Sequence, residues 1–123
     1  MAKVKQLTVA LENRPGTLAH MAKVLADAKV NITALLNSTS GAQGSAQVVV
    51  DNVNNAKKAL GAAGFSYTEG MVEQVELVNK PGALAQLAGR LANKGINIDC
   101  AYATMPKGAK KAVVVLALNG PTL

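Results

Sequence analysis

The loop Asn13-Arg14-Pro15-Gly16 and its near copy Asn79-Lys80-Pro81-Gly82 are the segments of this sequence best suited to chemistry. Each places polar residues before a Pro-Gly pair and an apolar run, a pattern that favours a turn followed by a helix start. A glycine lets the backbone approach a ligand closely, and the first N–H groups of a helix attract a carboxylate. An Asn amide both donates and accepts hydrogen bonds, which suits an ammonium beside that carboxylate. The pattern indicates a site for a small zwitterion, with a purely structural turn as the alternative.

Few other residues offer catalytic or metal chemistry. The chain has one histidine, His20, one cysteine, Cys100, and seven Asp and Glu residues that are well spread. A Ser-His-Asp or Cys-His arrangement, a carboxylate pair for acid–base work and a Cys-rich zinc site are therefore not expected. We expect His20 to lie at the surface and Cys100 to serve as a small apolar residue. The sequence predicts a protein that is not an enzyme and that uses no metal and no cofactor.

The two loops belong to an internal duplication. The segment Leu11–Ala19 recurs as Leu77–Ala85, at an offset of 66 residues. Carried on without a gap, the same offset pairs identical residues further along: Ala22 with Ala88, Leu25 with Leu91, Ala26 with Ala92, Asn31 with Asn97, Ile32 with Ile98, Ala46 with Ala112, Val48 with Val114, and Val49 with Val115. Because chance would not hold one register over that distance, the chain is interpreted as two copies of one unit.

Hydrophobic periodicity predicts the elements of each copy. The first copy is expected to hold a strand over 3–11, a helix with Pro15 at its first position, strands over 30–36 and 46–50 joined by a Gly-rich turn at 40–44, a helix over 53–63 capped by Asp51 or Asn52, and a strand from Phe65. The second copy repeats the first four elements, with strands over 96–102 and 112–118 and a turn at 106–110. The order β-α-β-β-α-β is the ferredoxin-like plan.

The second copy is shorter than the first. At the 66-residue offset, the helix over 53–63 would map to 119–129, whereas the sequence stops at Leu123. We therefore predict an α+β fold of two ferredoxin-like units, a complete one over 1–69 and a βαββ one over 70–123, with an antiparallel sheet and helices on one face. An uncovered sheet edge favours association, so we expect a homo-oligomer, most simply a dimer. A shortened chain is the alternative.

Composition and charge limit the remaining classes of protein. The formal charge of +6 favours a polyanion, and ferredoxin-like sheets also occur in RNA-binding proteins. However, the expected central strands carry valines in place of base-stacking aromatics, and the lysines are dispersed, so a nucleic-acid partner is not favoured. No apolar run approaches the ~20 residues of a membrane span, and the N-terminus lacks the apolar stretch of a signal peptide. With a single cysteine, a cytoplasmic protein without a membrane partner is expected.

The motifs together resemble a known family. Leu-Glu-Asn-Arg-Pro-Gly-Thr-Leu-Ala, followed by Val30-Asn31-Ile32, resembles an ACT domain, and Asn79-Lys80-Pro81-Gly82 with Gly95-Ile96-Asn97-Ile98 resembles a second. The pair is similar to small stand-alone tandem ACT proteins over nearly the whole chain. The resemblance implies βαββαβ modules that bind an amino acid or a similar effector. Such modules usually pair side by side and hold the ligand at the interface.

The resemblance also implies the site residues. They come from the strand–helix loop and from the start of the second strand, and we expect these two elements to lie side by side and to meet at one site. The first site would use Asn13, Arg14, Pro15, Gly16, Thr17, Leu18, Asn31 and Ile32, and the second would use Asn79, Lys80, Pro81, Gly82, Ala83, Leu84, Asn97 and Ile98. The expected function is regulatory amino-acid sensing. An assembly module with vestigial sites is the alternative.

Overall fold

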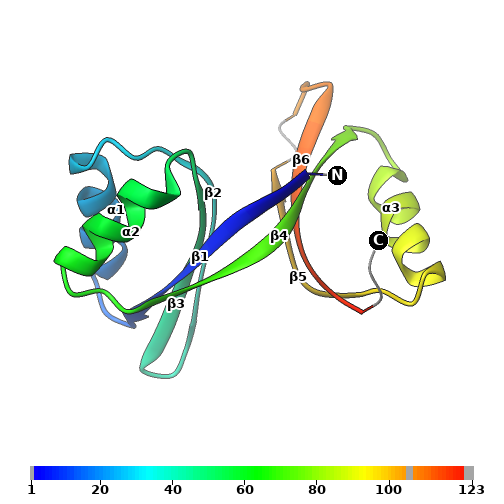
Figure 1. Cartoon of the computed structure of the whole chain (residues 1–123). Coiled ribbons are helices and arrows are strands. Elements are labelled where there is room, and N and C mark those ends of the chain that lie inside the picture. Colours follow the sequence, from blue (N-terminus) through cyan, green and yellow to red (C-terminus); the bar gives the residue numbers. More distant parts are fainter. Residues whose placement is uncertain (1, 105–106, 121–123) are drawn as a thin grey trace. The chain divides into compact units, whose positions relative to one another are not determined.

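The computed structural model describes residues 2–104 and 107–120 of the chain. The elements within these ranges follow the predicted order (Figure 1): β1 (Ala2–Glu12), α1 (Thr17–Asp27), β2 (Ile32–Ser40), β3 (Gln43–Val50), α2 (Val53–Ala62), β4 (Tyr67–Val78), α3 (Ala83–Asn93), β5 (Asn97–Thr104) and β6 (Lys111–Asn119). The predicted turn at 106–110 includes Pro106, which lies outside the described residues. None of the helices within residues 2–104 and 107–120 has the length and apolar character of a membrane-spanning helix.

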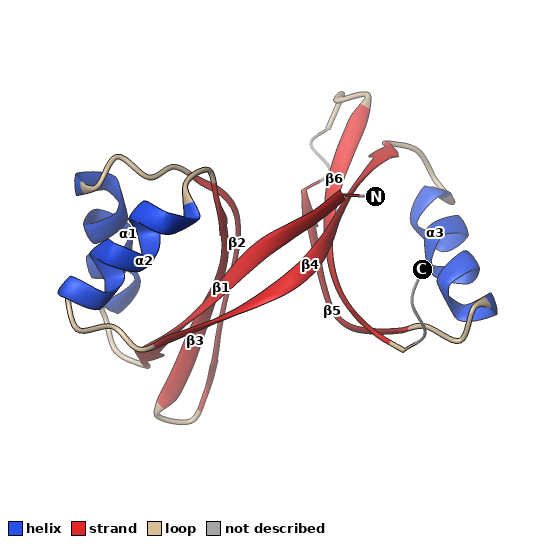
Figure 2. Ribbon diagram, viewed as in Figure 1, coloured by secondary structure: helices blue, strands red, loops and turns tan. Residues whose placement is uncertain are grey.

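The six strands form an antiparallel sheet in the hydrogen-bonded order β2-β3-β1-β4-β6-β5 (Figure 2). The predicted α+β class is therefore confirmed. The described residues of the second copy hold one helix, α3, and the strands β5 and β6 that follow it, as predicted for a copy without its last helix and strand.

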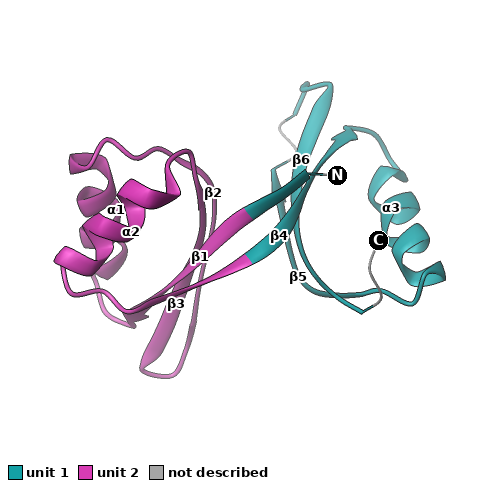
Figure 3. Cartoon of the chain, in the orientation of Figure 1, with its two compact units in different colours: residues 1–4, 71–123 teal, residues 5–70 magenta. Residues whose placement is uncertain are grey.

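The chain divides into two compact units (Figure 3). Unit 2 comprises residues 5–70, and unit 1 comprises residues 71–123 together with residues 1–4. Strands β1 and β4 are long enough to contribute residues to both units. The boundary that the sequence predicted between residues 69 and 70 stays a prediction.

The core of unit 2 lies between one face of its strands and the helices α1 and α2, which cover that same face (Figure 2). Strands β1 and β3 contribute alternate residues such as Leu7, Val9 and Val48, all fully buried, because successive side chains of a strand point to opposite faces. The helices add apolar residues at helical spacing, of which Met21, Leu25, Ala56 and Leu60 are fully buried.

The starts of the two helices in unit 2 differ from each other. As predicted, Asn52 caps α2, since its Oδ1 accepts a hydrogen bond of 3.0 Å from the backbone N–H of Asn55. The prediction that Pro15 takes the first helical position is wrong, because α1 begins at Thr17. Gly16, with φ of 92°, turns the chain between Pro15 and the helix.

The core of unit 1 repeats this plan with a single described helix. Leu87 and Leu91 of α3 pack on Val75, Val114 and Leu116 of the sheet. The turn after α3 places Gly95 at φ of 73°, beyond the helix end at Asn93, in agreement with the helix stop predicted there.

The strand registers show that the two copies are not related by one ungapped offset. Leu7 pairs with Val48 in unit 2, and the residue 66 positions after Leu7, Glu73, pairs with Leu116 in unit 1. Val48 therefore corresponds to Leu116, not to Val114 as predicted, because the hairpin between β5 and β6 is two residues longer than the hairpin between β2 and β3. Both hairpins nevertheless carry a bulge at the equivalent place, after Ile32 and after Ile98.

A small ion-pair cluster joins three elements of unit 2. The carboxylate of Glu69 on β4 lies 2.7 Å from Lys57 Nζ on α2 and 3.3 Å from Lys5 Nζ on β1. The hydrogen bonds from Lys57 and from Lys5 lower the pKa of Glu69 below its ordinary value of 4.5. The hydrogen bond to Glu69 in turn raises the pKa of Lys57.

Truncating Leu60 tests the packing of α2 on the sheet. Because Leu60 is fully buried, Leu60→Ala leaves a cavity and is expected to lower the free energy of unfolding by about 2–5 kcal/mol. Leu35, which is 42% exposed on β2, is the control, and Leu35→Ala is expected to cost less than about 1 kcal/mol. Urea unfolding followed by circular dichroism measures both values, and equal costs would contradict the assigned core.

The pH dependence of stability tests the Glu69 cluster. A carboxyl whose pKa is lower in the folded state stabilises the fold above its unfolded pKa and loses that contribution as the pH falls through its folded pKa. We therefore expect wild type to be more stable than Glu69→Gln near neutral pH, with a difference that shrinks as the pH falls below the ordinary pKa of 4.5 and disappears below the lowered pKa of the folded state. Urea unfolding across this pH range measures the difference. A difference that is constant with pH would show that the ion pairs do not act this way.

Candidate functional site

The loop between β1 and α1 presents an uncapped helix start. Gly16 lies at the N-cap position in the left-handed region, and no side chain caps the first N–H groups of α1. Gly82 does the same at the start of α3, with φ of 89°. Neither helix carries an acidic residue in its first turn. The partial positive charge of each helix start is therefore available to an anion.

The Asn of each loop holds the neighbouring hairpin in place. The side-chain Nδ2 of Asn13 donates a hydrogen bond of 2.7 Å to the carbonyl of Gly41, and its backbone N–H donates one of 3.0 Å to Ala42. Asn79 makes the same two bonds, each of 2.9 Å, to Ala109 and Lys110. One N–H of each amide that the sequence assigned to a ligand is thus used by a carbonyl of the protein.

A cleft of about 280 Å³ opens beside the first loop, within unit 2. Three segments form its walls: the end of β1, the loop with the first turn of α1, and the chain between α2 and β4. The lining residues are Ala10, Leu11, Glu12, Arg14, Gly16, Thr17, His20, Gly64, Phe65 and Ser66. A volume of this size accommodates a small metabolite.

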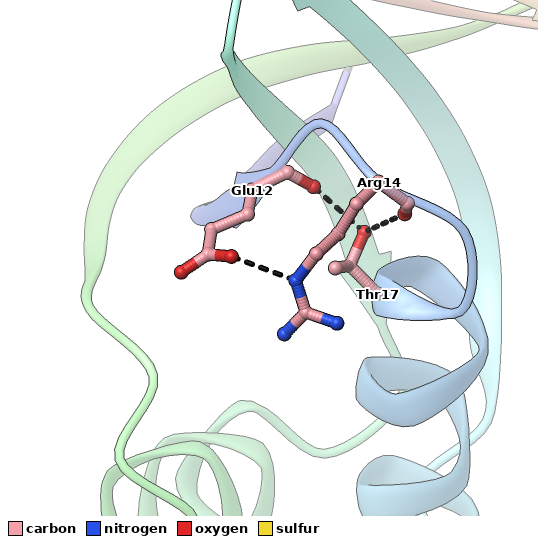
Figure 4. Close-up of polar contacts among 3 residues, drawn as sticks. All are labelled: Glu12, Arg14 and Thr17. Atoms are coloured by element: carbon pink, nitrogen blue, oxygen red, sulfur yellow. Dashed lines mark hydrogen bonds and ion pairs between the residues drawn. The ribbon is translucent and has the colours of Figure 1, made fainter.

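The polar groups on the loop side of the cleft are linked to one another (Figure 4). Arg14 Nε lies 2.7 Å from Glu12 Oε2, in an ion pair whose side chains are 65% and 70% exposed. Thr17 Oγ1 lies 2.9 Å from the carbonyl oxygen of Glu12 and 3.2 Å from that of Arg14. Its single proton is shared between these two acceptors and ties the start of α1 to the end of β1. The cleft therefore offers one cation, one anion and a helix start within a few residues.

The opposite side of the cleft contains residues that the sequence did not predict as site residues. The N–H of Ala10 donates a hydrogen bond of 2.9 Å to the carbonyl of Ser66, which fixes the segment after α2 against β1. Phe65 on that segment contacts the ring of His20, with centroids 5.1 Å apart. His20 is exposed, as predicted, and it also lines the cleft. Only the pairing of β4 with β1, which is a long-range feature, brings these side chains to the loop.

The structure separates the predicted residues of the first site into two groups. Arg14, Gly16 and Thr17 line the cleft, Asn13 and Pro15 are exposed beside it, and Leu18 packs against the core of unit 2. Asn31 and Ile32 lie elsewhere: the N–H of Asn31 donates to Asp51 Oδ1 at 2.9 Å, and Ile32 packs against the core.

The expectation that the loop and the start of the next strand meet within one copy is wrong. Strand β3 lies between β1 and β2 and is antiparallel to both, so β1 and β2 run parallel. Glu12 at the end of β1 pairs with Gln43, whereas Ile32 at the start of β2 pairs with Val50, seven residues further along β3. At about 3.3 Å per residue, the two elements lie roughly 23 Å apart.

The second copy carries the loop with different side chains around it. Asn79 is half-buried in its hairpin bonds, Lys80, Pro81 and Gly82 are exposed, and Ala83 and Leu84 begin α3. Farther on, Asn97 Nδ2 donates to Asp99 Oδ1 at 2.7 Å, and Ile98 packs against the core of unit 1. At the 66-residue offset Val78 replaces Glu12, Ala83 replaces Thr17 and Gln86 replaces His20. Among the described residues of unit 1, nothing corresponds to the segment Gly64–Ser66.

Comparison with known sequences identifies the family. The family described as "ACT domain pair" matches residues 2–120. The chain belongs to the ACT domain family. This confirms the resemblance that the two loop motifs indicated. A search of curated proteins finds no match.

Solved structures share the fold of this ACT domain pair. Protein BT0572 from Bacteroides thetaiotaomicron is 30% identical with a TM-score of 0.90, and the match covers 96% of this chain and 81% of that one. The ligand-free regulatory subunit of aspartate kinase from Thermus thermophilus is 17% identical (TM-score 0.70, 94% and 85% covered). The regulatory subunit from Thermus flavus is 19% identical (TM-score 0.65, 94% and 85% covered). At these identities the two kinase subunits show a common fold.

Two glycines with equally open surroundings test the loop conformation. An added Cβ would meet nothing within 4 Å at Gly16 or at Gly89, but only Gly16 has a positive φ, of 92°. Gly16→Ala is expected to lower the free energy of unfolding by about 1–2 kcal/mol, because an L-residue is strained there. Gly89→Ala, inside α3, is expected to raise it by about 0.5–1 kcal/mol. Changes of the same sign in urea unfolding would contradict the assigned backbone conformation.

Proposed function

We propose that this ACT domain pair is a regulatory sensor without catalytic activity and that a free amino acid binds in the cleft beside the first loop. Membership of the ACT domain family supports a regulatory ligand-binding role. The observation that carries the finer proposal is the juxtaposition of Arg14, Glu12 and the uncapped start of α1 in one cleft. An amino acid carries the complementary pair of charges, an ammonium and a carboxylate, on groups bonded to the same carbon.

The placement of the ligand follows from these charges. The α-carboxylate would lie at the first N–H groups of α1 and accept a hydrogen bond from Arg14, since helix starts and guanidinium groups both favour carboxylates. The α-ammonium would lie against the carboxylate of Glu12. The side chain would then point to the wall formed by Phe65 and His20, so this wall would select among amino acids.

The second loop is a poorer amino-acid site on the same criteria. It has a cation, Lys80, and a helix start, but Val78 and Ala83 offer neither a carboxylate nor a hydroxyl. We therefore propose one cleft-bound ligand per chain. The predicted contacts Asn31, Ile32, Asn97 and Ile98 lie far from the loop of their own copy, and a homodimer would be one way to bring them to a ligand.

Amino-acid binding is tested by a thermal-shift screen against the common amino acids, followed by titration calorimetry. A ligand at a hundredfold its Kd is expected to add about 2.7 kcal/mol to the stability. Arg14→Gln is expected to weaken binding about tenfold or more, because a charge-assisted hydrogen bond is lost. Lys80→Gln, at the equivalent position of the second loop, is the matched control and should bind like wild type with one ligand per chain.

Three outcomes would contradict the proposal. Flat melting curves for every amino acid, with no ligand recovered by native mass spectrometry, would favour an assembly module with vestigial sites. Equal weakening by Arg14→Gln and Lys80→Gln would remove the distinction between the two loops. A stoichiometry of two ligands per chain would show that Glu12 and Thr17 are not needed.

A further inference from the structure

We infer that the loop end of unit 1 is a docking surface for an acidic segment of a partner protein. The surface, here called the lysine patch, consists of Lys80, Lys107, Lys110 and Lys111 with the exposed apolar side chain of Val78. It lies in unit 1, whereas the amino-acid cleft lies in unit 2.

Backbone pairing holds the lysine patch together. Val78, the last residue of β4, pairs with Lys111, the first residue of β6. The next residue, Asn79, is fixed in position, because its N–H donates a hydrogen bond to the carbonyl of Lys110 and its Nδ2 donates one to the carbonyl of Ala109. Lys80 follows directly, and Lys107 lies in the same hairpin as Lys110. Four cations therefore come from two segments that are fixed against each other.

Of the four lysines of the patch, one has an acidic partner among the described residues. Lys111 lies 3.4 Å from Glu76 Oε1, in an exposed pair, and no described acidic side chain forms an ion pair with Lys80, Lys107 or Lys110. Unit 1 has seven Lys and Arg against three Asp and Glu, and unit 2 has six against four. The patch holds four of the seven cations of unit 1, whose net charge is 7 − 3 = +4 against 6 − 4 = +2 for unit 2.

Unit 2 shows that this loop and hairpin do not need lysines in order to fold. Its loop makes the same Asn-to-hairpin hydrogen bonds, yet its hairpin turn, Ser40–Gln43, is uncharged. Its loop cation, Arg14, is paired with Glu12. Mutual repulsion makes a cluster of like charges unfavourable in the absence of a partner. The four lysines are therefore better explained by an anionic partner than by the stability of unit 1.

The surroundings of the lysines favour an acidic polypeptide. A second copy of this chain, with a net charge of +6, is a poor electrostatic match for this positive surface. No aromatic side chain belongs to the patch, so it lacks the stacking surface typical of single-stranded nucleic-acid sites. Val78, 57% exposed, and Leu84 at the start of α3, 46% exposed, offer apolar contacts of the kind that a peptide with mixed acidic and apolar residues uses.

A labelled peptide of alternating Glu and Leu is the probe, and fluorescence anisotropy is the readout. The triple variant Lys80→Gln, Lys107→Gln and Lys110→Gln is expected to weaken peptide binding at least about tenfold, and binding by wild type should weaken as salt is added. The matched control, Lys29→Gln, Lys58→Gln and Lys94→Gln, removes the same charge from exposed positions elsewhere and should stay within about twofold of wild type.

Several results would overturn the inference. They are equal weakening by both triple variants, no binding of the peptide by wild type, and tighter binding of an oligothymidylate of equal charge than of the peptide. The control variant is expected to melt like wild type and the patch variant at the same or a slightly higher temperature, because the substituted side chains are exposed and the patch variant loses mutual repulsion. Amino-acid binding by the patch variant should be unchanged, so a failure of the cleft proposal and a failure of this one are distinguishable.

Discussion

The double pairing of strand β3 is the constraint on which the rest of unit 2 depends. Val48, fully buried, pairs with Leu7 of β1 on one side and with Leu35 of β2 on the other. Because β3 is antiparallel to both neighbours, β1 and β2 must run in the same direction, and α1 must cross one face of the sheet to connect them. The end of β1 and the start of β2 therefore lie at opposite ends of the sheet. The second wall of the cleft comes from the chain that returns after α2, as Phe65 shows.

The hydrogen bonds from Asn13 and Asn79 explain how the two loops keep one shape while their surroundings differ. Each Asn binds two consecutive carbonyls of the adjacent hairpin, and this holds although the second hairpin is two residues longer. The shape thus depends on the Asn and on a glycine with positive φ, at Gly16 and Gly82. The charged side chains next to each Asn are not needed for it, so they can form an ion pair in the first loop and belong to a group of lysines in the second.

Local patterns in the sequence were sufficient to predict the strands, the helices and most of the buried residues. This is because strand and helix periodicity and the Asn52 cap depend only on nearby residues. Features that depend on pairing between distant segments were not predictable in this way. Identical residues such as Val48 and Val114 suggested an ungapped offset, but the strand register is set by the length of the hairpin. Similarly, Phe65 joins the candidate site only because the segment before β4 bonds to Ala10. The prediction for Pro15 failed because Gly16, with its positive φ, interrupts the chain before the helix.

The ion pair between Glu12 and Arg14 has properties that suit a ligand-responsive loop. Both side chains are more than half exposed, and a pair of this kind contributes only about 0–1 kcal/mol to stability. Turning Arg14 from Glu12 towards a ligand carboxylate would therefore cost little, and the ligand ammonium would replace the guanidinium beside Glu12. The bonds that Thr17 makes to the carbonyls of Glu12 and Arg14 do not involve these charged groups, so the backbone of the loop would keep its shape during the exchange. Any signal to a partner would then come from the direction of the Arg14 side chain, and a partner would respond to the ligand only if it bound the two arrangements with different affinity.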